Sequence, residues 1–266
     1  MLSIIVTFIV AFFLFYAWHM MGITIGYHRL LSHRSFCCPK LIEYFWVLGG
    51  YLAFQGSPIW WATMHRTHHR YTDQPFDPHS PRLSGWKYAY YGWIKEPGYP
   101  EYIDPMIQCR DVAKDQLYKW LEQGGDWRKA HKLCFRLGIA YRIILMLCFG
   151  WVIALADFVA ALVVQHIPLL LNVICHMPKL GYKNYSTPDG SVNVWWVAIL
   201  TAGEGWHNNH HAFPGSARSG LRHFEIDPSW LTLRLMKLIG LIQWMHEESI
   251  LSKYKPAPKQ SVLTTG

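Results

Sequence analysis

Eight of the fifteen histidines lie in three short clusters, and neutral imidazole is the commonest protein ligand for transition metals. The clusters read His28-Arg-Leu-Leu-Ser-His33, His65-Arg-Thr-His68-His69 and His207-Asn-Asn-His210-His211. Residues three and four apart share a helix face, so each of the last two clusters can present three imidazoles to one side. His28 and His33 are five apart, about 140° around an ideal helix. We expect this pair either to serve two different metals or to straddle a helix end.

Two further candidate ligands, Asn172 and His176, are four residues apart near the end of an apolar stretch. Together with the clusters they make nine histidines and one asparagine, too many for one ion with four to six ligands, so we expect two metal ions. Nitrogen ligands without thiolate suit iron, zinc or copper, and two irons with open positions would activate dioxygen. The six cysteines form no Cys-x-x-Cys pair, which argues against structural zinc and iron–sulfur clusters.

Long apolar stretches must position these ligands. Residues 2–26 contain no charged side chain and are long enough to span a bilayer, and residues 133–176 contain only three charged ones. We expect spans near residues 2–26, 137–156 and 158–176, the last two joined by a tight turn near Ala156-Asp157. Residues 44–54 are too few to cross and predict a buried or interfacial helix, whereas residues 74–132 predict an ordered segment outside the membrane. The predicted fold is therefore an all-α integral membrane protein of about three spans within residues 1–254, followed by a disordered tail at 255–266.

Basic residues flank the predicted spans, at Arg29, Arg34 and Lys40 and again at Lys132 and Lys179. The positive-inside rule then places all three histidine clusters on the cytoplasmic face of a multi-pass protein. The same rule, together with anionic lipid surfaces, accounts for the formal charge of +8. No basic, aromatic-interleaved reader motif is visible, so we expect the lipid bilayer and not nucleic acid as a partner.

Six histidines lie outside the candidate ligand set, and we expect structural roles for them: His19, His79, His131, His166, His223 and His246. His19 and His166 fall inside predicted spans, where a hydrogen bond to a neighbouring helix would satisfy them. His79, in Asp77-Pro78-His79, is also a candidate for contact with a polar part of the substrate.

The motifs resemble those of the integral-membrane fatty acyl desaturases, specifically the Δ9 acyl-lipid/acyl-CoA (stearoyl-type) group. The similarity runs from about Gly22 to about Trp230, in the same order and spacing. The stretches that carry it are His28-Arg-Leu-Leu-Ser-His33-Arg-Ser-Phe, Trp61-Ala-Thr-Met-His65-Arg-Thr-His68-His69, Asp77-Pro-His and Trp195-Trp-Val-Ala-Ile-Leu-Thr-Ala-Gly-Glu-Gly-Trp-His207-Asn-Asn-His210-His211.

This resemblance implies a cytoplasmic helical cap that holds a di-iron site. Dioxygen and two electrons would be used to introduce a cis double bond, at Δ9, into a saturated acyl chain carried on lipid, CoA or ACP. An asparagine matching Asn172 would approach one iron through water. The implied histidine ligands are His28, His33, His65, His68, His69, His176, His207, His210 and His211.

The resemblance also implies a narrow apolar tunnel that fixes which carbon faces the metals. Candidate substrate contacts are Trp60, Trp61, His79 and Trp206, with Trp195 and Trp196 as further candidate walls, although tryptophan at a membrane interface is more often an anchor. No haem-binding His-Pro-Gly-Gly occurs, so we expect a separate electron donor, a ferredoxin or cytochrome-b-type protein with its reductase. The basic face favours an acidic donor.

Two departures from the family pattern are visible. Family members usually carry one more span before the first histidine box, giving four, so we expect either a truncated start or another element that seals that face. Tyr90 also stands where the family commonly has a histidine, which predicts altered contacts with the substrate headgroup.

Two alternative functions remain open at this stage. Membrane hydroxylases and ketolases acting on hydrocarbon or sterol substrates also carry three histidine clusters of this kind. A non-enzymatic zinc or haem membrane protein is the other alternative, although a transporter would place its ligands at mid-membrane and not at the ends of spans.

Overall fold

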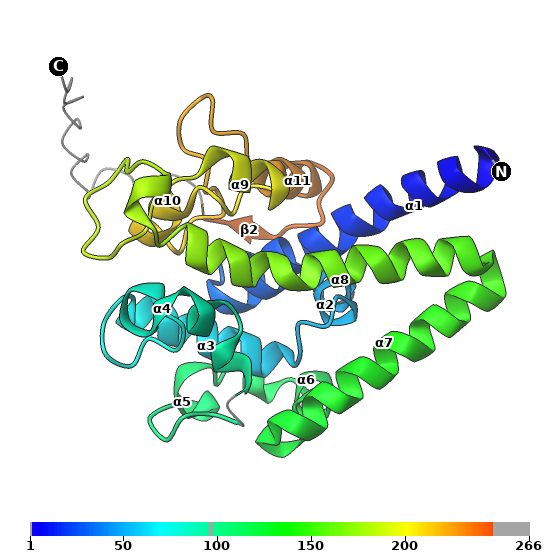
Figure 1. Ribbon diagram of the computed structural model, residues 1–266, viewed down its shortest axis with the longest axis horizontal. Coiled ribbons are helices and arrows are strands. Elements are labelled where there is room, and N and C mark those ends of the chain that lie inside the picture. The colour runs from blue at the N-terminus through cyan, green and yellow to red at the C-terminus, as the bar shows by residue number, and fades with distance from the viewer. Residues whose placement is uncertain (1, 96–97, 247–266) are drawn as a thin grey trace.

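The computed structural model describes residues 2–95 and 98–246, and most of them are helical, as the sequence predicts. Three long helices project to one side of the molecule (Figure 1): α1 (Leu2–Met21), α7 (Trp127–Phe149) and α8 (Trp151–Ile174). Most of the shorter α-helices form a cap at the other side: α3 (Pro58–Tyr71), α4 (Pro81–Tyr90), α5 (Pro105–Gln108), α6 (Gln116–Glu122), α9 (Trp195–Leu200), α10 (His207–Ala212) and α11 (Pro228–Leu238). The remaining one, α2 (Lys40–Leu52), lies near the middle of the view.

The remaining elements are short connections, apart from one long π-helix, η1 (Gly22–Ser32), that continues α1. Two strands, β1 (Phe36–Cys37) and β2 (Trp244–Met245), pair antiparallel and tie the end of the described chain to the residues after η1. Four 3₁₀ turns complete the description: η2 (Gly92–Lys95), η3 (Val112–Lys114), η4 (Gln123–Gly125) and η5 (Pro178–Leu180). The predicted tail at 255–266 lies outside the described residues.

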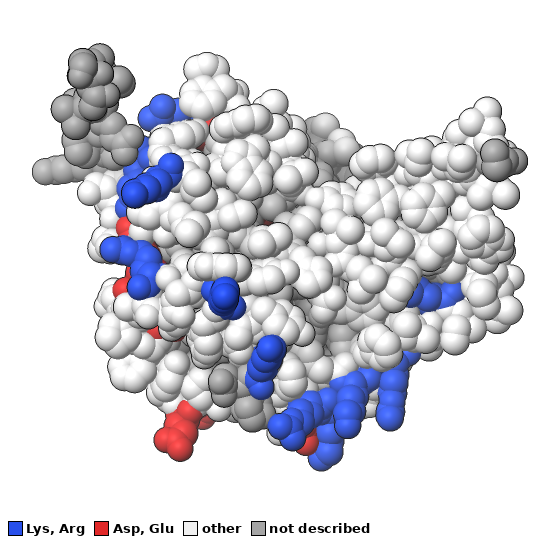
Figure 2. Space-filling model, in the orientation of Figure 1, with Lys and Arg blue, Asp and Glu red and all other residues white. Residues whose placement is uncertain are grey.

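Two helical stretches among the described residues are long and apolar enough to cross a membrane, Leu2–Ser32 and Trp151–Ile174. The space-filling view agrees, since charged side chains gather over the cap and near the first turns of α7, while the projecting helices are almost uncharged (Figure 2). α7 does not reach the same apolar composition, so a third crossing remains a prediction.

The expected turn near Ala156-Asp157 is wrong, because the chain reverses at Gly150 between α7 and α8, where φ is 89°. Spans at 137–156 and 158–176 are accordingly replaced by helices at 127–149 and 151–174. Asp157 lies inside α8, fully buried, with Oδ1 2.9 Å from Arg142 Nη2 and Oδ2 3.1 Å from His19 Nε2. A charged residue in an apolar stretch here marks a buried ion pair and not a loop.

The π-helix η1 packs against α2, the short helix expected at residues 44–54. Glycines permit this close approach: a Cβ at Gly22 would collide with the backbone of Gly50, and one at Gly26 would lie 2.9 Å from Trp46 C. At the end of η1 the amide of His33 donates a hydrogen bond to the carbonyl of His28, five residues earlier, at 3.0 Å. This wider helical repeat decides how the first histidine pair is presented.

Candidate metal centre

Helix α3 carries the second histidine cluster and begins with a well-formed N-terminus. Pro58 occupies the first turn, and the Ser57 hydroxyl accepts a hydrogen bond from the amide of Ile59. The cluster then divides: His65 and His69 belong to one group of convergent histidines and His68 to another. We expected three imidazoles on one side, and the structure shows that they lie beside two different candidate metal positions.

The first cluster contributes both of its histidines to a single group. His28 and His33 are five residues apart, and the i→i+5 repeat of the π-helix brings residues at that spacing onto nearly the same face. The expectation that this pair serves two different metals is therefore wrong. The other expectation is confirmed, because His33 caps the C-terminus of η1.

The third cluster lies on α10, one short helix whose two asparagines fix it in place. Asn208 Oδ1 accepts hydrogen bonds from the amides of Asn184 and Tyr185, and Asn209 Oδ1 accepts from Asn184 Nδ2 and Asn193 Nδ2. The buried Asn-Asn pair of the motif therefore anchors the histidines to the preceding loop.

The nitrogen atoms of nine histidines converge in two groups, each with its ligand atoms within 4.8 Å of one another. In the five-histidine group, Nε2–Nε2 distances are 3.0 Å for His28–His210, 2.9 Å for His69–His210 and 2.9 Å for His33–His65. In the four-histidine group, they are 3.1 Å for His176–His207 and 3.0 Å for His207–His211. The five-histidine group is His28, His33, His65, His69 and His210; the four-histidine group is His68, His176, His207 and His211.

Carboxylates hold the outer nitrogens of four of these rings. The Nδ1 atoms of His68, His176, His211 and His28 lie 3.0, 3.1, 3.2 and 2.6 Å from oxygens of Asp77, Asp73, Asp189 and Glu204, respectively. A neutral ring that donates from Nδ1 has a bare lone pair on Nε2. The Nε2 atoms of His176, His211 and His28 lie within 3.1 Å of a neighbouring ring nitrogen, whereas His68 Nε2 has no hydrogen-bond partner among the described residues.

This arrangement fits a pair of metal ions. Nitrogens bound about 2.1 Å from one ion at right angles to each other are separated by about 3 Å, the spacing seen in both groups. Ligand rings held through Nδ1 by carboxylates are the usual support of histidine metal sites. The donor set of neutral nitrogen without sulfur suits iron, zinc or copper.

The electrostatics of the site keep most of the candidate ligands neutral; at His68 burial alone would lower the pKa, but the contact with the Asp77 carboxylate outweighs it and the pKa is raised. Burial, reinforced by the neighbouring imidazoles, lowers the pKa of His65, His69, His207 and His210 well below 6.5. Burial alone would raise the pKa of the Asp73 carboxyl, but its contact with His176 outweighs this and holds the pKa at about 2. The Asp73 carboxylate is therefore charged at neutral pH, and these four rings are available there as neutral ligands.

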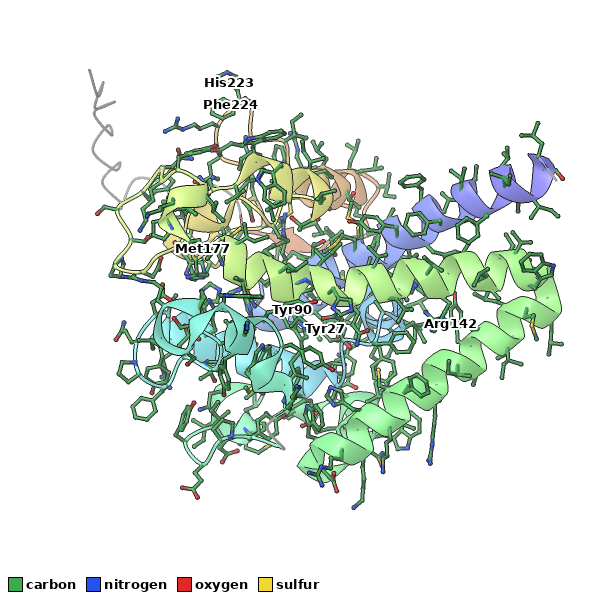
Figure 3. The ribbon with its side chains drawn as sticks, in the orientation of Figure 1. Tyr27, Tyr90, Arg142, Met177, His223 and Phe224 are labelled. Carbon is green, nitrogen blue, oxygen red and sulfur yellow. The ribbon has the colours of Figure 1, made fainter. Side chains whose placement is uncertain are left out.

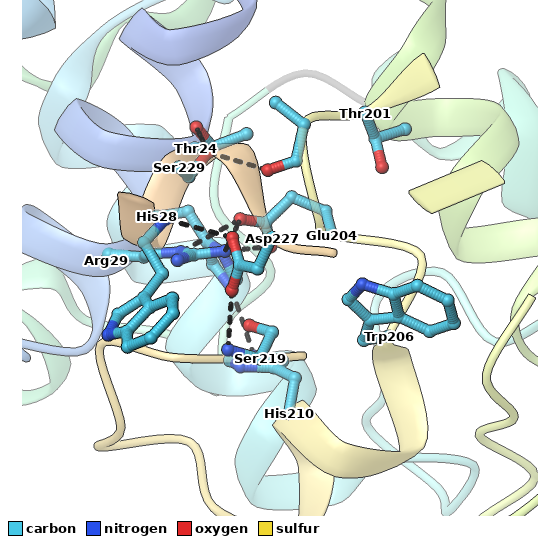
Figure 4. Close-up of polar contacts among 12 residues, drawn as sticks. Thr24, His28, Arg29, Thr201, Glu204, Trp206, His210, Ser219, Asp227 and Ser229 are labelled. Atoms are coloured by element: carbon cyan, nitrogen blue, oxygen red, sulfur yellow. Dashed lines mark hydrogen bonds and ion pairs between the residues drawn. The ribbon is translucent and has the colours of Figure 1, made fainter. Parts of the chain in front are cut away.

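A buried ion-pair network supports the five-histidine group from the side of η1 (Figure 4). Glu204 contacts His28 through Oε2, and its Oε1 accepts from Arg29 Nε at 3.1 Å. Arg29 also donates to Asp227 Oδ1 at 3.0 Å and to the carbonyl of Ala217 at 2.7 Å. The chain segments at η1, α10 and α11 are thus locked together through one fully paired guanidinium.

An apolar cavity reaches the centre between α3, α8 and the segment after α4. Its walls include the predicted substrate contacts Trp60, Trp61 and His79, and it meets the centre at His65 and Asn172. Asn172 also lines a second hollow that includes His28 and His207, so it lies between the two groups.

The other tryptophans have different places in the structure. Trp206 is not among the cavity walls; it is buried and donates from Nε1 to the carbonyl of Ile226 at 2.8 Å. Trp195 and Trp196 are 62% and 41% exposed and line none of the described cavities at the centre, which favours the anchoring alternative.

The histidines expected to be structural in the apolar helices do bond to neighbouring elements. His19 shares a hydrogen bond with the carbonyl of Gly49 in α2 at 2.7 Å, in addition to its contact with α8. His166 in α8 pairs through Nδ1 with the Tyr90 hydroxyl of α4 at 2.9 Å. Tyr90 is labelled in Figure 3, next to the ribbon of α8. Tyr90, which stands where the family commonly has a histidine, therefore holds the ring of His166, a residue that lines the cavity.

Sequence reasoning missed the four supporting carboxylates. Asp77 stood in a noted motif, Asp77-Pro78-His79, and Glu204 in the run before His207, so both carried a signal that could have been used. Asp73 and Asp189 carried none, because their contacts depend on loops that the chain brings together only in three dimensions.

The structure has long apolar helices on one side and a histidine-rich candidate metal centre on the other. These two features indicate the class of protein: a membrane-associated metalloprotein. Residues 4–231 match the family model described as Fatty acid desaturase. The chain is 40% identical over 233 residues to the "sn-1 stearoyl-lipid 9-desaturase" of Anabaena variabilis, covering 87% of this chain and 81% of that protein. It is 40% identical over 223 residues to the "Delta-9 acyl-lipid desaturase 1" of Arabidopsis thaliana, covering 83% and 69%.

A third similar protein is the "sn-1 stearoyl-lipid 9-desaturase" of Synechocystis sp., 37% identical over 232 residues, or 87% of this chain and 69% of that one. The chain belongs to the fatty acid desaturase family. It is an oxidoreductase that introduces a double bond into a fatty acyl chain.

Proposed function

We propose that this enzyme holds two irons, one in the five-histidine group and one in the four-histidine group, with Asn172 approaching the second through water. The observation that carries the proposal is the convergence of nine imidazoles at about 3 Å spacing, four of them held by carboxylates. Bound there, iron supplies the dioxygen activation that unactivated methylene C–H bonds require.

The chain's own residues orient the reaction. Asp73, Asp77 and Asp189 fix ring planes by accepting from Nδ1, and the Glu204 carboxylate lies 2.6 Å from His28 Nδ1; Nε2 of each ring is left free to ligate. The cavity walls hold the acyl chain in an extended or bent path past His65 and exclude water from the reacting carbons.

The substrate we propose is a saturated acyl chain on a membrane lipid, desaturated at Δ9. The names of the similar proteins from Anabaena, Synechocystis and Arabidopsis support a lipid carrier and the Δ9 position. The apolar helices anchor a multi-pass protein whose centre faces the cytoplasm, and the basic residues near the cap support this orientation.

Expression in a desaturase-deficient host tests the proposal. We expect mass spectrometry of the host lipids to show a new monounsaturated fatty acid with its double bond at Δ9, and none with His210→Ala. Hydroxylated products in place of olefins would favour the hydroxylase alternative, and stoichiometric zinc or haem in the purified protein would contradict di-iron chemistry.

The cavity can be tested with two neighbouring leucines of α8. Leu169 is buried and lines the cavity, whereas Leu170 is 43% exposed. We expect Leu169→Trp to fill the acyl path and lower desaturation at least tenfold while the metal content is retained. Leu170→Trp is the matched control and should keep full activity; equal activity of both variants would show that the acyl chain binds elsewhere.

A further inference from the structure

A basic hollow opens on the cap beside the five-histidine group. The residues that line this basic hollow include Arg34, Arg66, Ile107, Arg110, Asp111 and Lys114. Four cations thus face a single carboxylate. Asp111 already accepts from Arg34 Nε at 2.6 Å and from Arg66 Nη1 and Nη2 at 2.7 and 2.8 Å, which leaves Arg110 and Lys114 exposed and without an ion-pair partner among the described residues.

The hollow is attached directly to the backbone that carries the metal-binding histidines. Arg66 follows His65, and its guanidinium donates to the carbonyls of Leu31 and Ser32 at 2.6 and 2.8 Å, just before His33. His33 is only partly buried, whereas His65 is buried. Ser32 and Arg34, on either side of His33, line the hollow, which therefore lies directly beside a partly buried member of the five-histidine group.

An apolar surface adjoins the free charges. Ile107 is 73% exposed and the preceding Met106 is 51% exposed, both on α5. Apolar side chains next to unpaired cations form the kind of patch that recognises a partner of opposite charge, since the charges steer the encounter and the apolar groups add contact.

The reaction itself requires such a partner. One turnover takes two hydrogens from the acyl chain and reduces one dioxygen to two waters, so two further electrons and two protons must be delivered. We propose, resting on the desaturase function above, that the basic hollow is the docking surface for a small acidic electron-transfer protein. Its acidic side chains pair with Arg110 and Lys114, and electrons enter the centre on the His33 side.

Anaerobic stopped-flow kinetics test this with reduced plant-type [2Fe–2S] ferredoxin as the donor and iron-loaded full-length enzyme as the acceptor. We expect the double variant Arg110→Glu, Lys114→Glu to lower the second-order rate constant at low ionic strength at least tenfold and to remove most of its salt dependence. The matched control is Lys129→Glu with Lys179→Glu, an equal change of charge at two exposed positions elsewhere, which should stay within twofold of the parent enzyme.

Direct reduction with dithionite separates failure of the docking surface from failure of the function. The Arg110/Lys114 variant should be reduced by dithionite at the parent rate, which shows an intact centre. Unchanged donor kinetics in that variant, or an equal loss in the control, overturns the docking surface alone; a parent enzyme that dithionite does not reduce overturns the di-iron function. If the variant instead loses binding to phosphatidylglycerol vesicles with normal donor kinetics, the hollow serves lipid headgroups and the proposal is wrong.

Discussion

Carboxylates are unequally distributed between the two histidine groups. Three of the four rings in the four-histidine group are held by aspartates that are at most 8% exposed, whereas in the five-histidine group only His28 is held, by Glu204. The charge of Glu204 is shared with Arg29. Negative charge therefore accumulates around the group with fewer ligands, and it favours a cation there.

Asp189→Asn should lower metal affinity at the four-histidine group by about 10–100-fold. Asp189 accepts from His211 Nδ1 with one oxygen and from the Ser191 amide with the other, so the amide of asparagine must lose one of these contacts. Titration of metal-free protein with Co²⁺, followed by its absorption spectrum, measures the effect. Glu101→Gln, at an exposed position, is the control; identical affinities for the two variants would remove Asp189 from the site.

The histidines themselves could be found from sequence, but their division between two groups could not. Helical spacing places His65, His68 and His69 on one side of α3, and both candidate metal positions lie on that side. To assign each ring to one of the two groups, one must know where η1 and α10 lie relative to α3. These elements are far apart in sequence and come together only in the folded chain. The place of Trp206 could not be found from sequence either: it precedes the candidate ligand His207, yet it donates to the carbonyl of Ile226 and does not line the cavity.

At the scale of elements, close packing of η1 on α2 sets the centre's position. Backbone contact at Gly22 and Gly26 leaves no space for side chains, so the two elements fit in one register. The sequence indicated a short helix at this place and a long apolar helix before it. It did not indicate the π-helix, because a wider helical repeat follows from packing and not from the pattern of apolar residues.

Gly22→Val should destabilise the protein by about 3 kcal/mol and lower its iron content, because a branched side chain must push η1 away from α2. Thermal unfolding in detergent and metal analysis measure both effects. Gly215→Val is the control, since a Cβ there meets nothing within 4 Å. If both variants unfold at the same temperature, the contact between η1 and α2 is looser than the structure indicates.

On the scale of the whole molecule, the centre joins parts of the chain that are far apart in sequence. The candidate ligands come from η1, α3, the end of α8 and α10, so bound metal would cross-link the cap to the long helices. The all-α class and the side-by-side placement of the clusters followed from composition and spacing. The α7–α8 turn did not, because a buried ion pair and a loop carry the same signature of a charge within an apolar run.

Removal of metal should therefore loosen the whole protein. We expect chelation to lower the unfolding temperature by about 10 °C and added Fe²⁺ to restore it, since ligand present at a thousand times its Kd contributes about 4 kcal/mol. Differential scanning fluorimetry measures the shift. An unchanged melting temperature in the chelated enzyme would mean that the cap holds its shape without the metals.

On the predicted topology, in which α7 also crosses the membrane, the ion pair between Arg142 and Asp157 bears on how the chain enters the bilayer during synthesis. Each charge would oppose insertion of its own helix by about 2.5–3.5 kcal/mol at mid-membrane, whereas at 2.9 Å the two neutralise each other. We therefore expect α7 and α8 to leave the translocon together as a hairpin. α1, synthesised earlier, would wait in the membrane with His19 Nε2 unpaired until Asp157 arrives, although His19 Nδ1 already bonds to the carbonyl of Gly49 in α2.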